Sequence, residues 1–178
     1  MKAWLIFLII VLVFCPVQAQ DTPEVGAGEA FRYVYMEFQG PHTAIRENIG
    51  VFFQEIRKQR IQSKLKGDLF GVFFDSAIIE ADRGTTWGLG FKIESGCVVH
   101  PPLKTASYDY PRVVRMMHRG PYEMVGLAIN TIVQFIEQNR LRVIGPPLEI
   151  WLDENPNQTP PEDRRTEIII PVEKKTSG

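Results

Sequence analysis

The sequence predicts an α+β fold in which one strand-helix-strand-strand unit occurs twice. We expect an antiparallel sheet, two long helices on one side of it and a central ligand groove. Three observations support this prediction: Gly40-Pro41 recurs as Gly120-Pro121 at an offset of 80 residues, a strand-like run precedes each pair, and an amphipathic helical pattern follows each. Such self-similarity indicates a pseudo-symmetric duplication.

The strand-like runs before the two Gly-Pro pairs cover residues 32–38 and 112–118. After each pair, apolar residues recur every three or four positions with polar residues between them, which is typical of a helix with one buried face. These apolar positions are Ile45, Ile49, Phe52, Phe53 and Ile56 in the first unit, and Val125, Ile129, Ile132, Val133 and Ile136 in the second.

Two extended segments follow each predicted helix. They cover residues 70–74 and 86–93 in the first unit, and 148–152 and 166–172 in the second. The loops between them are rich in turn-forming Asp, Asn, Gly and Pro. We therefore assign repeat one to about 31–94 and repeat two to about 104–174.

The first 19 residues have the pattern of a secretory signal peptide. Lys2 is followed by an apolar run that ends at Pro16, and small residues lie before a cleavage point after Ala19. The alternative is a membrane anchor, although the run is shorter than the roughly 20 residues that span a bilayer. We expect a periplasmic or extracellular protein that meets the membrane only through its signal peptide, with a linker at 20–30 and one domain at 31–174.

Composition limits the possible functions of this domain. A hydrophobic fraction of 44% allows a core, and the predicted mature chain keeps Cys97 as its single cysteine, so no disulfide framework is expected. Without Lys2 the predicted mature chain has 19 basic and 21 acidic residues. This charge balance argues against a nucleic-acid-binding function. We find no metal-ligand spacing, cofactor motif or activated nucleophile, and therefore predict no metal, no cofactor and no catalytic residue.

Several segments resemble the GyrI-like small-molecule-binding family, which also supplies the effector-binding domains of AraC- and MerR-type regulators. They are His118-Arg119-Gly120-Pro121-Tyr122, Gly145-Pro146-Pro147, the run 148–153 and the run 165–172. The resemblance covers roughly residues 30 to 174. It implies a groove that takes bulky, often aromatic and cationic compounds and that contains an acidic residue. No DNA-binding helix-turn-helix precedes the matching region, so we do not expect a role in transcription.

The resemblance implies Glu167 as the groove carboxylate and Glu149 as a second one. Alternation along the strands places Leu148, Ile150 and Leu152 on one face, and because the helices need an apolar face, we expect both glutamates to point together into the groove. The alternative is that they are solvated or paired with Arg115, Arg164 or Arg165. The aromatic candidates for the same groove are Trp87, Trp151, Tyr122 and Phe73.

The expected function is capture of a hydrophobic, possibly cationic small molecule between the two repeats. A desolvated carboxylate gains from a cation, and aromatic rings attract the same cation. An alternative, implied by some members of the family, is hydrolysis of strained cyclopropane-type rings in aromatic natural products, with Glu167 beside Trp87 or Tyr122. A weaker alternative is haem binding through His118, because the SOUL proteins share a related duplicated architecture.

Overall fold

Both repeats form the predicted order of elements. The computed structural model describes residues 21–41, 44–74, 85–153, 155 and 157–175, so the predicted signal peptide lies outside the described residues. In chain order the strands and helices are β1 (Glu24–Ala27), β2 (Phe31–Gly40), α1 (Ile45–Lys58), β3 (Leu65–Phe73), β4 (Thr85–Ile93), β5 (Leu103–Tyr108), β6 (Arg112–Arg119), α2 (Val125–Gln138), β7 (Leu141–Val143), β8 (Leu148–Trp151) and β9 (Arg165–Lys174).

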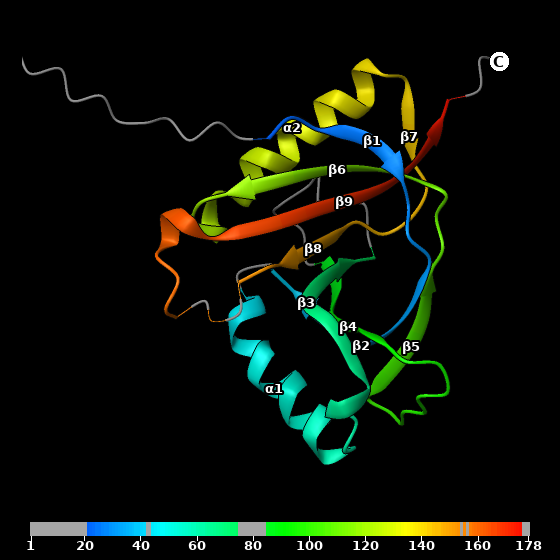
Figure 1. Cartoon of the computed structure of the whole chain (residues 1–178), viewed down its shortest axis with the longest axis vertical. Coiled ribbons are helices and arrows are strands. Elements are labelled where there is room, and N and C mark those ends of the chain that lie inside the picture. Colours follow the sequence, from blue (N-terminus) through cyan, green and yellow to red (C-terminus); the bar gives the residue numbers. More distant parts are fainter. Residues whose placement is uncertain (1–20, 42–43, 75–84, 154, 156, 176–178) are drawn as a thin grey trace, which may run out of the picture.

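The strands form one twisted antiparallel sheet with the order β1-β6-β9-β8-β3-β4-β2-β5, and β7 pairs with β9 (Figure 1). Repeat one supplies β2, β3 and β4, and repeat two supplies β6, β8 and β9. The two repeats join where β3 pairs with β8, with Gly71 opposite Glu149. The predicted α+β class with a duplicated unit is confirmed.

The recurring Gly-Pro pairs have a conformational cause. Gly40 and Gly120 have φ angles of 130° and 127°, a region that residues with a side chain rarely adopt. Each glycine ends a strand and lets the chain turn back over the sheet as a helix. Arg60 and Arg140, also 80 residues apart, have positive φ angles of 57° and 52° just after the helices. Turn geometry therefore repeats together with sequence.

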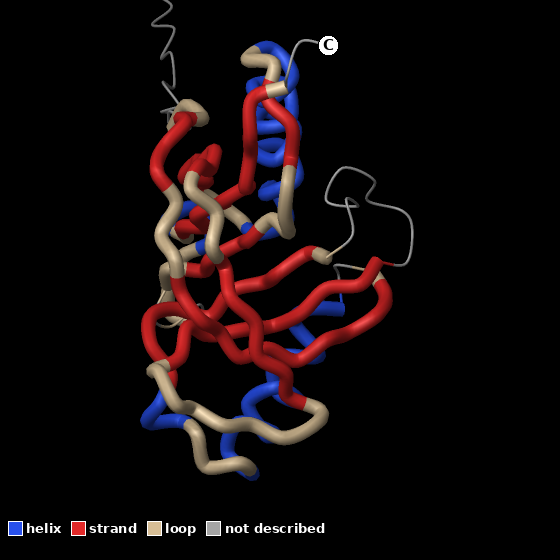
Figure 2. The backbone as a smooth tube through the Cα atoms, turned by 90° about the vertical axis from the view of Figure 1, so that its right-hand side faces the viewer, coloured by secondary structure: helices blue, strands red, loops and turns tan. Residues whose placement is uncertain are grey.

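Both helices pack on the same face of the sheet, which we call the helix face. Phe52 and Ile56 of α1, and Ile132 and Ile136 of α2, belong to one buried cluster with the strand residues of that face. Figure 2 shows the helices toward opposite ends of the long axis, with strands between them. Neither helix in the described ranges has the length and hydropathy that crossing a bilayer requires.

The opposite face, which we call the aromatic face, carries a second buried cluster. Tyr33, Phe70 and Tyr108 are its aromatic members, and Val72 and Leu148 complete it. Phe31 stacks on Tyr108 with ring centroids 5.2 Å apart, and Tyr33 meets Phe70 edge to face at 5.6 Å. Edge-to-face and offset ring pairs stabilise a core beyond their buried area. Both faces of the sheet are therefore covered.

Three strands were not expected from the sequence. β1 lies in the segment expected to be a linker and pairs with β6, β5 pairs with β2, and β7 pairs with β9. β1 and β7 are short, and β5 (Leu-Lys-Thr-Ala-Ser-Tyr) has few apolar residues. Their pairing depends on partners far away in the chain, so local patterns do not reveal it.

Candidate functional site

Glu149 is a carboxylate with little solvent and no partner at the centre of the helix face. Its strand neighbours are Gly71 on β3 and Ile168 on β9. The residue is 8% exposed, and its carboxylate receives no hydrogen bond and forms no ion pair within the described part of the chain. Burial raises the pKa of Glu149 to about 7. Burial of this group therefore carries a desolvation cost that no described residue offsets.

Two aromatic rings converge beside this carboxylate. A Cβ atom added to Gly71 would lie 3.1 Å from Cζ of Phe73 and 3.2 Å from Cη2 of Trp151. Phe73 and Trp151 stand 78 residues apart, at equivalent positions of β3 and β8. Gly71 therefore leaves room for both rings at the junction of the repeats, directly across from Glu149.

The prediction that the two glutamates point together is wrong. Strand β8 pairs with β9 so that Glu149 lies opposite Ile168, while Glu167 lies opposite Ile150. Residues directly opposite each other share a face, so Glu167 lies on the aromatic face and Glu149 on the helix face. The expectation assumed that the helices cover the apolar side of β8. In the structure, Leu148 and Ile150 instead pack into the aromatic cluster.

Glu167 has a cationic neighbour on the aromatic face. Its Oε1 lies 3.8 Å from Nη1 of Arg115, and Nη2 of Arg115 also donates a hydrogen bond of 2.9 Å to the carbonyl of Ala27. This is the ion pair that the sequence left open as an alternative for Glu167.

Replacement of Glu167 by glutamine should have a small effect on stability. Both side chains of the pair are partly exposed, at 35% for Arg115 and 25% for Glu167. Pairs of this kind contribute at most about 1 kcal/mol. We expect urea unfolding of Glu167→Gln to show a loss below about 1 kcal/mol that shrinks further in high salt. A loss several times larger would assign this pair a structural role.

Trp87 lies on the helix face but is fully buried. It stacks on Phe38 with ring centroids 4.9 Å apart, and it lies opposite Phe73 in the pairing of β3 with β4. Its Nε1 finds no hydrogen-bond acceptor among the described residues. Trp87 therefore packs as a core residue next to Phe73.

Tyr122 belongs to a separate polar cluster at the start of α2. Its hydroxyl donates a hydrogen bond of 2.8 Å to Oδ2 of Asp153, which also accepts one of 3.1 Å from the backbone N–H of Arg165. The guanidinium of Arg164 lies 4.9 Å from the centre of the Tyr122 ring. Burial and the bond to Asp153 raise the pKa of Tyr122.

His118 is a structural residue of the helix face. It is 1% exposed, and its Nε2 lies 3.1 Å from the carbonyl oxygen of Pro121. A carbonyl only accepts hydrogen bonds, so Nε2 carries the proton. This nitrogen is therefore engaged, which argues against the haem ligation considered above.

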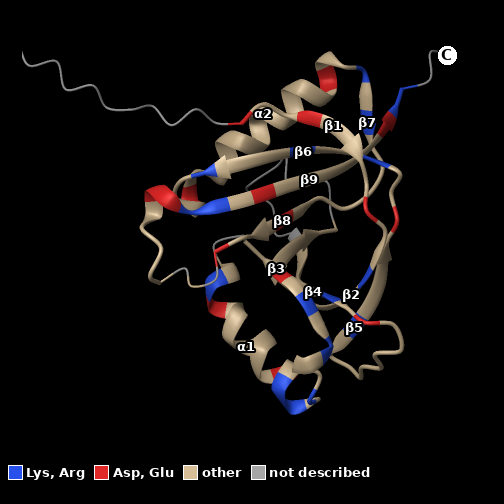
Figure 3. Ribbon diagram, in the orientation of Figure 1, with Lys and Arg blue, Asp and Glu red and all other residues tan. Residues whose placement is uncertain are grey.

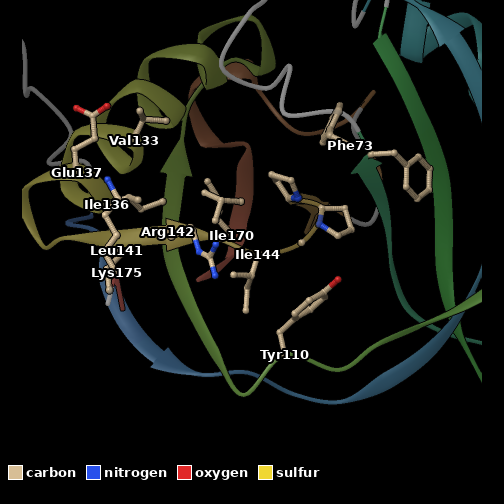
Figure 4. A pocket seen from close by; sticks show the side chains of 15 residues that line it. Phe73, Tyr110, Val133, Ile136, Glu137, Leu141, Arg142, Ile144, Ile170 and Lys175 are labelled. Carbon is tan, nitrogen blue, oxygen red and sulfur yellow. The ribbon is translucent and has the colours of Figure 1, made fainter. Parts of the chain in front are cut away.

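An open pocket of about 720 Å³ lies on the other side of Phe73 (Figure 4). Figure 4 shows Val133 and Ile136 of α2 on one side of it and Phe73 on the other, with Ile170 between. The volume falls in the range of pockets that take drug-sized molecules. Phe73 thus borders both this pocket and the junction where Glu149 and Trp151 lie.

Sequence reasoning missed Tyr110 and the segment 144–147, which also line the pocket. A Cβ atom at Gly145 would lie 2.2 Å from Cζ of Tyr110, so the ring packs directly on the glycine. In the sequence, Gly145-Pro146-Pro147 contributed only to the family resemblance, and nothing in that segment indicated this contact.

Charge is sparse at the junction of the repeats. In Figure 3 charged segments occur on both helices and on outer and inner strands, β9 and β3 among them, while β8 carries little colour. Glu149 is the only charged residue of β8. Within the described ranges, His, Cys, Asp and Glu form no group of three that could hold a metal ion.

The chain is a duplicated α+β unit with a buried carboxylate and aromatic rings at its central junction. A family model, described as the GyrI-like small molecule binding domain, matches residues 23–173. The chain belongs to the GyrI-like family. Among curated proteins none matches the sequence.

Solved structures share the fold at low sequence identity. The C-terminal domain of EcmrR is 19% identical with a TM-score of 0.73, over 87% of this chain and 99% of that one. A hydrolase from Listeria innocua is 17% identical with a TM-score of 0.59, over 86% and 93%. SAV2435 bound to tetraphenylphosphonium is 14% identical with a TM-score of 0.59, over 85% and 93%.

Proposed function

We propose that this protein binds a lipophilic, aromatic cation at the junction of its two repeats, with Glu149 as the counter-charge. The observation that carries the proposal is the buried carboxylate without a partner beside Trp151 and Phe73. A bound cation would form an ion pair with the Glu149 carboxylate, which has no partner among the described residues. The two rings would attract the same cation through their π faces. The family match to a small-molecule-binding domain supports this function.

The pocket beyond Phe73 offers room for the rest of such a ligand. Its lining includes the apolar side chains of Val133, Ile136 and Ile170, which suit aromatic groups, together with the charged residues Glu137, Arg142 and Lys175. Phe73 belongs both to this lining and to the pair of rings over Gly71, opposite Glu149. A ligand that extends from Glu149 into the pocket would contact the Phe73 ring. We therefore expect binding to change the environment of Trp151, whose ring meets that of Phe73 over Gly71.

The test is a fluorescence titration of the protein with tetraphenylphosphonium, the cation bound to SAV2435, and with neutral triphenylphosphine oxide. We expect saturable quenching that favours the cation. Glu149→Gln keeps the shape of the side chain and removes its charge. It should lower the affinity for the cation about tenfold to a hundredfold, as expected for a lost charge-assisted contact.

Glu167→Gln is the matched control, because it removes the same charge from the other face of the sheet. It should leave the affinity for tetraphenylphosphonium unchanged. If Glu167→Gln weakens binding and Glu149→Gln does not, the site lies on the aromatic face and our assignment is wrong.

Hydrolysis of a strained cyclopropane-type ring in an aromatic natural product is the second candidate function. Two similar structures are described as hydrolases from Listeria innocua. A carboxylate with a pKa of about 7 is suited to take a proton from water near neutral pH. Mass spectrometry of an aryl cyclopropane after incubation separates the two functions. An enzyme adds the mass of one water, and a binding protein returns the compound intact.

Export of the protein is part of the proposal. Residues 1–19 would direct it across the membrane, and the ligand would then be met in the periplasm or outside the cell. N-terminal sequencing of the protein from cell fractions tests this. A chain that begins at Gln20 in the exported fraction supports it, and an uncleaved chain in the cytoplasm contradicts it.

A further inference from the structure

We propose that the site around Glu149 exchanges a proton for its cationic ligand, so that binding at acidic pH releases a proton to solvent. This inference rests on the proposed function and adds its regulation by pH. It follows from the position of the carboxylate, which is buried at a place where the surrounding strands offer it no charge and no hydrogen bond.

The strand residues that flank Glu149 on the helix face carry no charge. On β3 they are Leu69, Gly71 and Phe73, and on β9 they are Thr166, Ile168 and Ile170. On β8 itself, Trp151 is the neighbour on the same face. A carboxylate in this setting is more stable as the neutral acid until a cation arrives.

Titratable groups on the surrounding elements are already engaged or exposed. On β6, His118 uses Nε2 toward Pro121, and Asp153 beyond β8 accepts from Tyr122. At the first turns of the helices, Arg46 and Glu123 lie 3.8 Å apart and are 79% and 69% exposed. On the rest of α1 and α2, Glu55 is bonded by Lys58 and Gln59, and Glu47, Arg57 and Glu137 are exposed.

The exchange has a simple proton balance. In the free protein at acidic pH the acid form of Glu149 keeps its proton. On binding, that proton leaves to the buffer, and the carboxylate forms an ion pair with the positive charge of the ligand. A neutral aromatic ligand brings no charge and therefore releases no proton.

The exchange predicts how affinity depends on pH. With half-ionisation near pH 7 and a neutral form that binds about tenfold to a hundredfold more weakly, the affinity for tetraphenylphosphonium should rise about sevenfold to twentyfold from pH 5.5 to pH 8 and level off above that. The affinity for triphenylphosphine oxide should not rise. Acidification would thus release a bound cation, and neutral pH would retain it.

The experiment is isothermal titration calorimetry of tetraphenylphosphonium at pH 6 in two buffers that differ in ionisation enthalpy. The difference in apparent binding enthalpy gives the number of protons released. We expect about 0.4 to 0.8 proton for the unaltered protein and for Glu167→Gln, as follows from the tenfold to hundredfold weaker binding of the neutral form, and none for Glu149→Gln. Thermal melts check that each variant is folded.

The outcomes separate this inference from the proposed function. If tetraphenylphosphonium binds without proton release and with the same affinity at pH 5.5 and pH 8, the exchange is refuted and the binding function stands. If it binds at no pH between these values, the proposed function fails and the exchange fails with it. Proton release that persists in Glu149→Gln would assign the exchange to another group.

Discussion

Glu149→Gln should stabilise the protein by about 3 kcal/mol at pH 8 and leave its stability nearly unchanged at pH 4. The side chain has an ordinary pKa of 4.5 in the unfolded chain and about 7 in the fold. A raised pKa means that the folded protein holds the proton more tightly than the unfolded chain. The native carboxyl therefore lowers stability as the pH rises from about 4.5 to 7, and each unit of pKa shift corresponds to about 1.4 kcal/mol.

Urea unfolding of both proteins from pH 4 to pH 8 measures this difference. Glutamine is similar in size and stays neutral, so it removes the cost of ionising a buried group and little else. Glu167→Gln should not reproduce the pH-dependent gain, since Glu167 is 25% exposed and paired with Arg115. A constant difference between the proteins at all pH values would mean that Glu149 ionises as easily in the fold as in the unfolded chain.

Trp87→Ala should lower the free energy of unfolding by about 3 to 5 kcal/mol. The side chain is fully buried, stacks on Phe38 and lies opposite Phe73, so truncation leaves a large cavity. Trp87→Phe should cost clearly less, because phenylalanine keeps the stacking and also removes an indole N–H that has no acceptor within the described ranges.

Chemical denaturation followed by far-UV circular dichroism ranks the two Trp87 variants, and a tetraphenylphosphonium titration at a temperature where both are folded gives their affinity. We expect the stability to fall in the order unaltered protein, Trp87→Phe, Trp87→Ala. A loss below about 1 kcal/mol in Trp87→Ala, combined with a large loss of affinity, would show that Trp87 is a ligand contact rather than a core residue.

The duplicated architecture was predictable because its causes are local. Each Gly-Pro pair and the 3.6-residue apolar period after it can be recognised in a short window of sequence. The structure gives the glycine of each pair a positive φ angle, which explains why a glycine stands there. The inner strands were also recognisable from the sequence, because their β-branched and aromatic residues form local runs. The strands β1, β5 and β7 lack such runs and are held by partners that only the folded sheet provides.

The candidate site was predictable only in part. Glu149, Trp151 and Phe73 were expected in the groove and do lie together on the helix face. The position of Glu167 was not predictable, because the register between β8 and β9 depends on the loop from 152 to 164 and a shift of one residue changes the face. The aromatic face was also unexpected. The sequence-based prediction assumed that only the face under the helices is apolar, and the structure shows that both faces carry buried apolar side chains.

Duplication within a single chain has a consequence at the pairing of Gly71 with Glu149. Two identical copies related by an exact two-fold axis would present the same residue twice at this point: two carboxylates that repel each other or two glycines with no charge at all. Covalent fusion allows the copies to diverge, so that one contributes the acid and the other contributes empty space. A single carboxylate opposite a glycine is thus available to this chain, whereas a homodimer of identical halves would present two carboxylates or none.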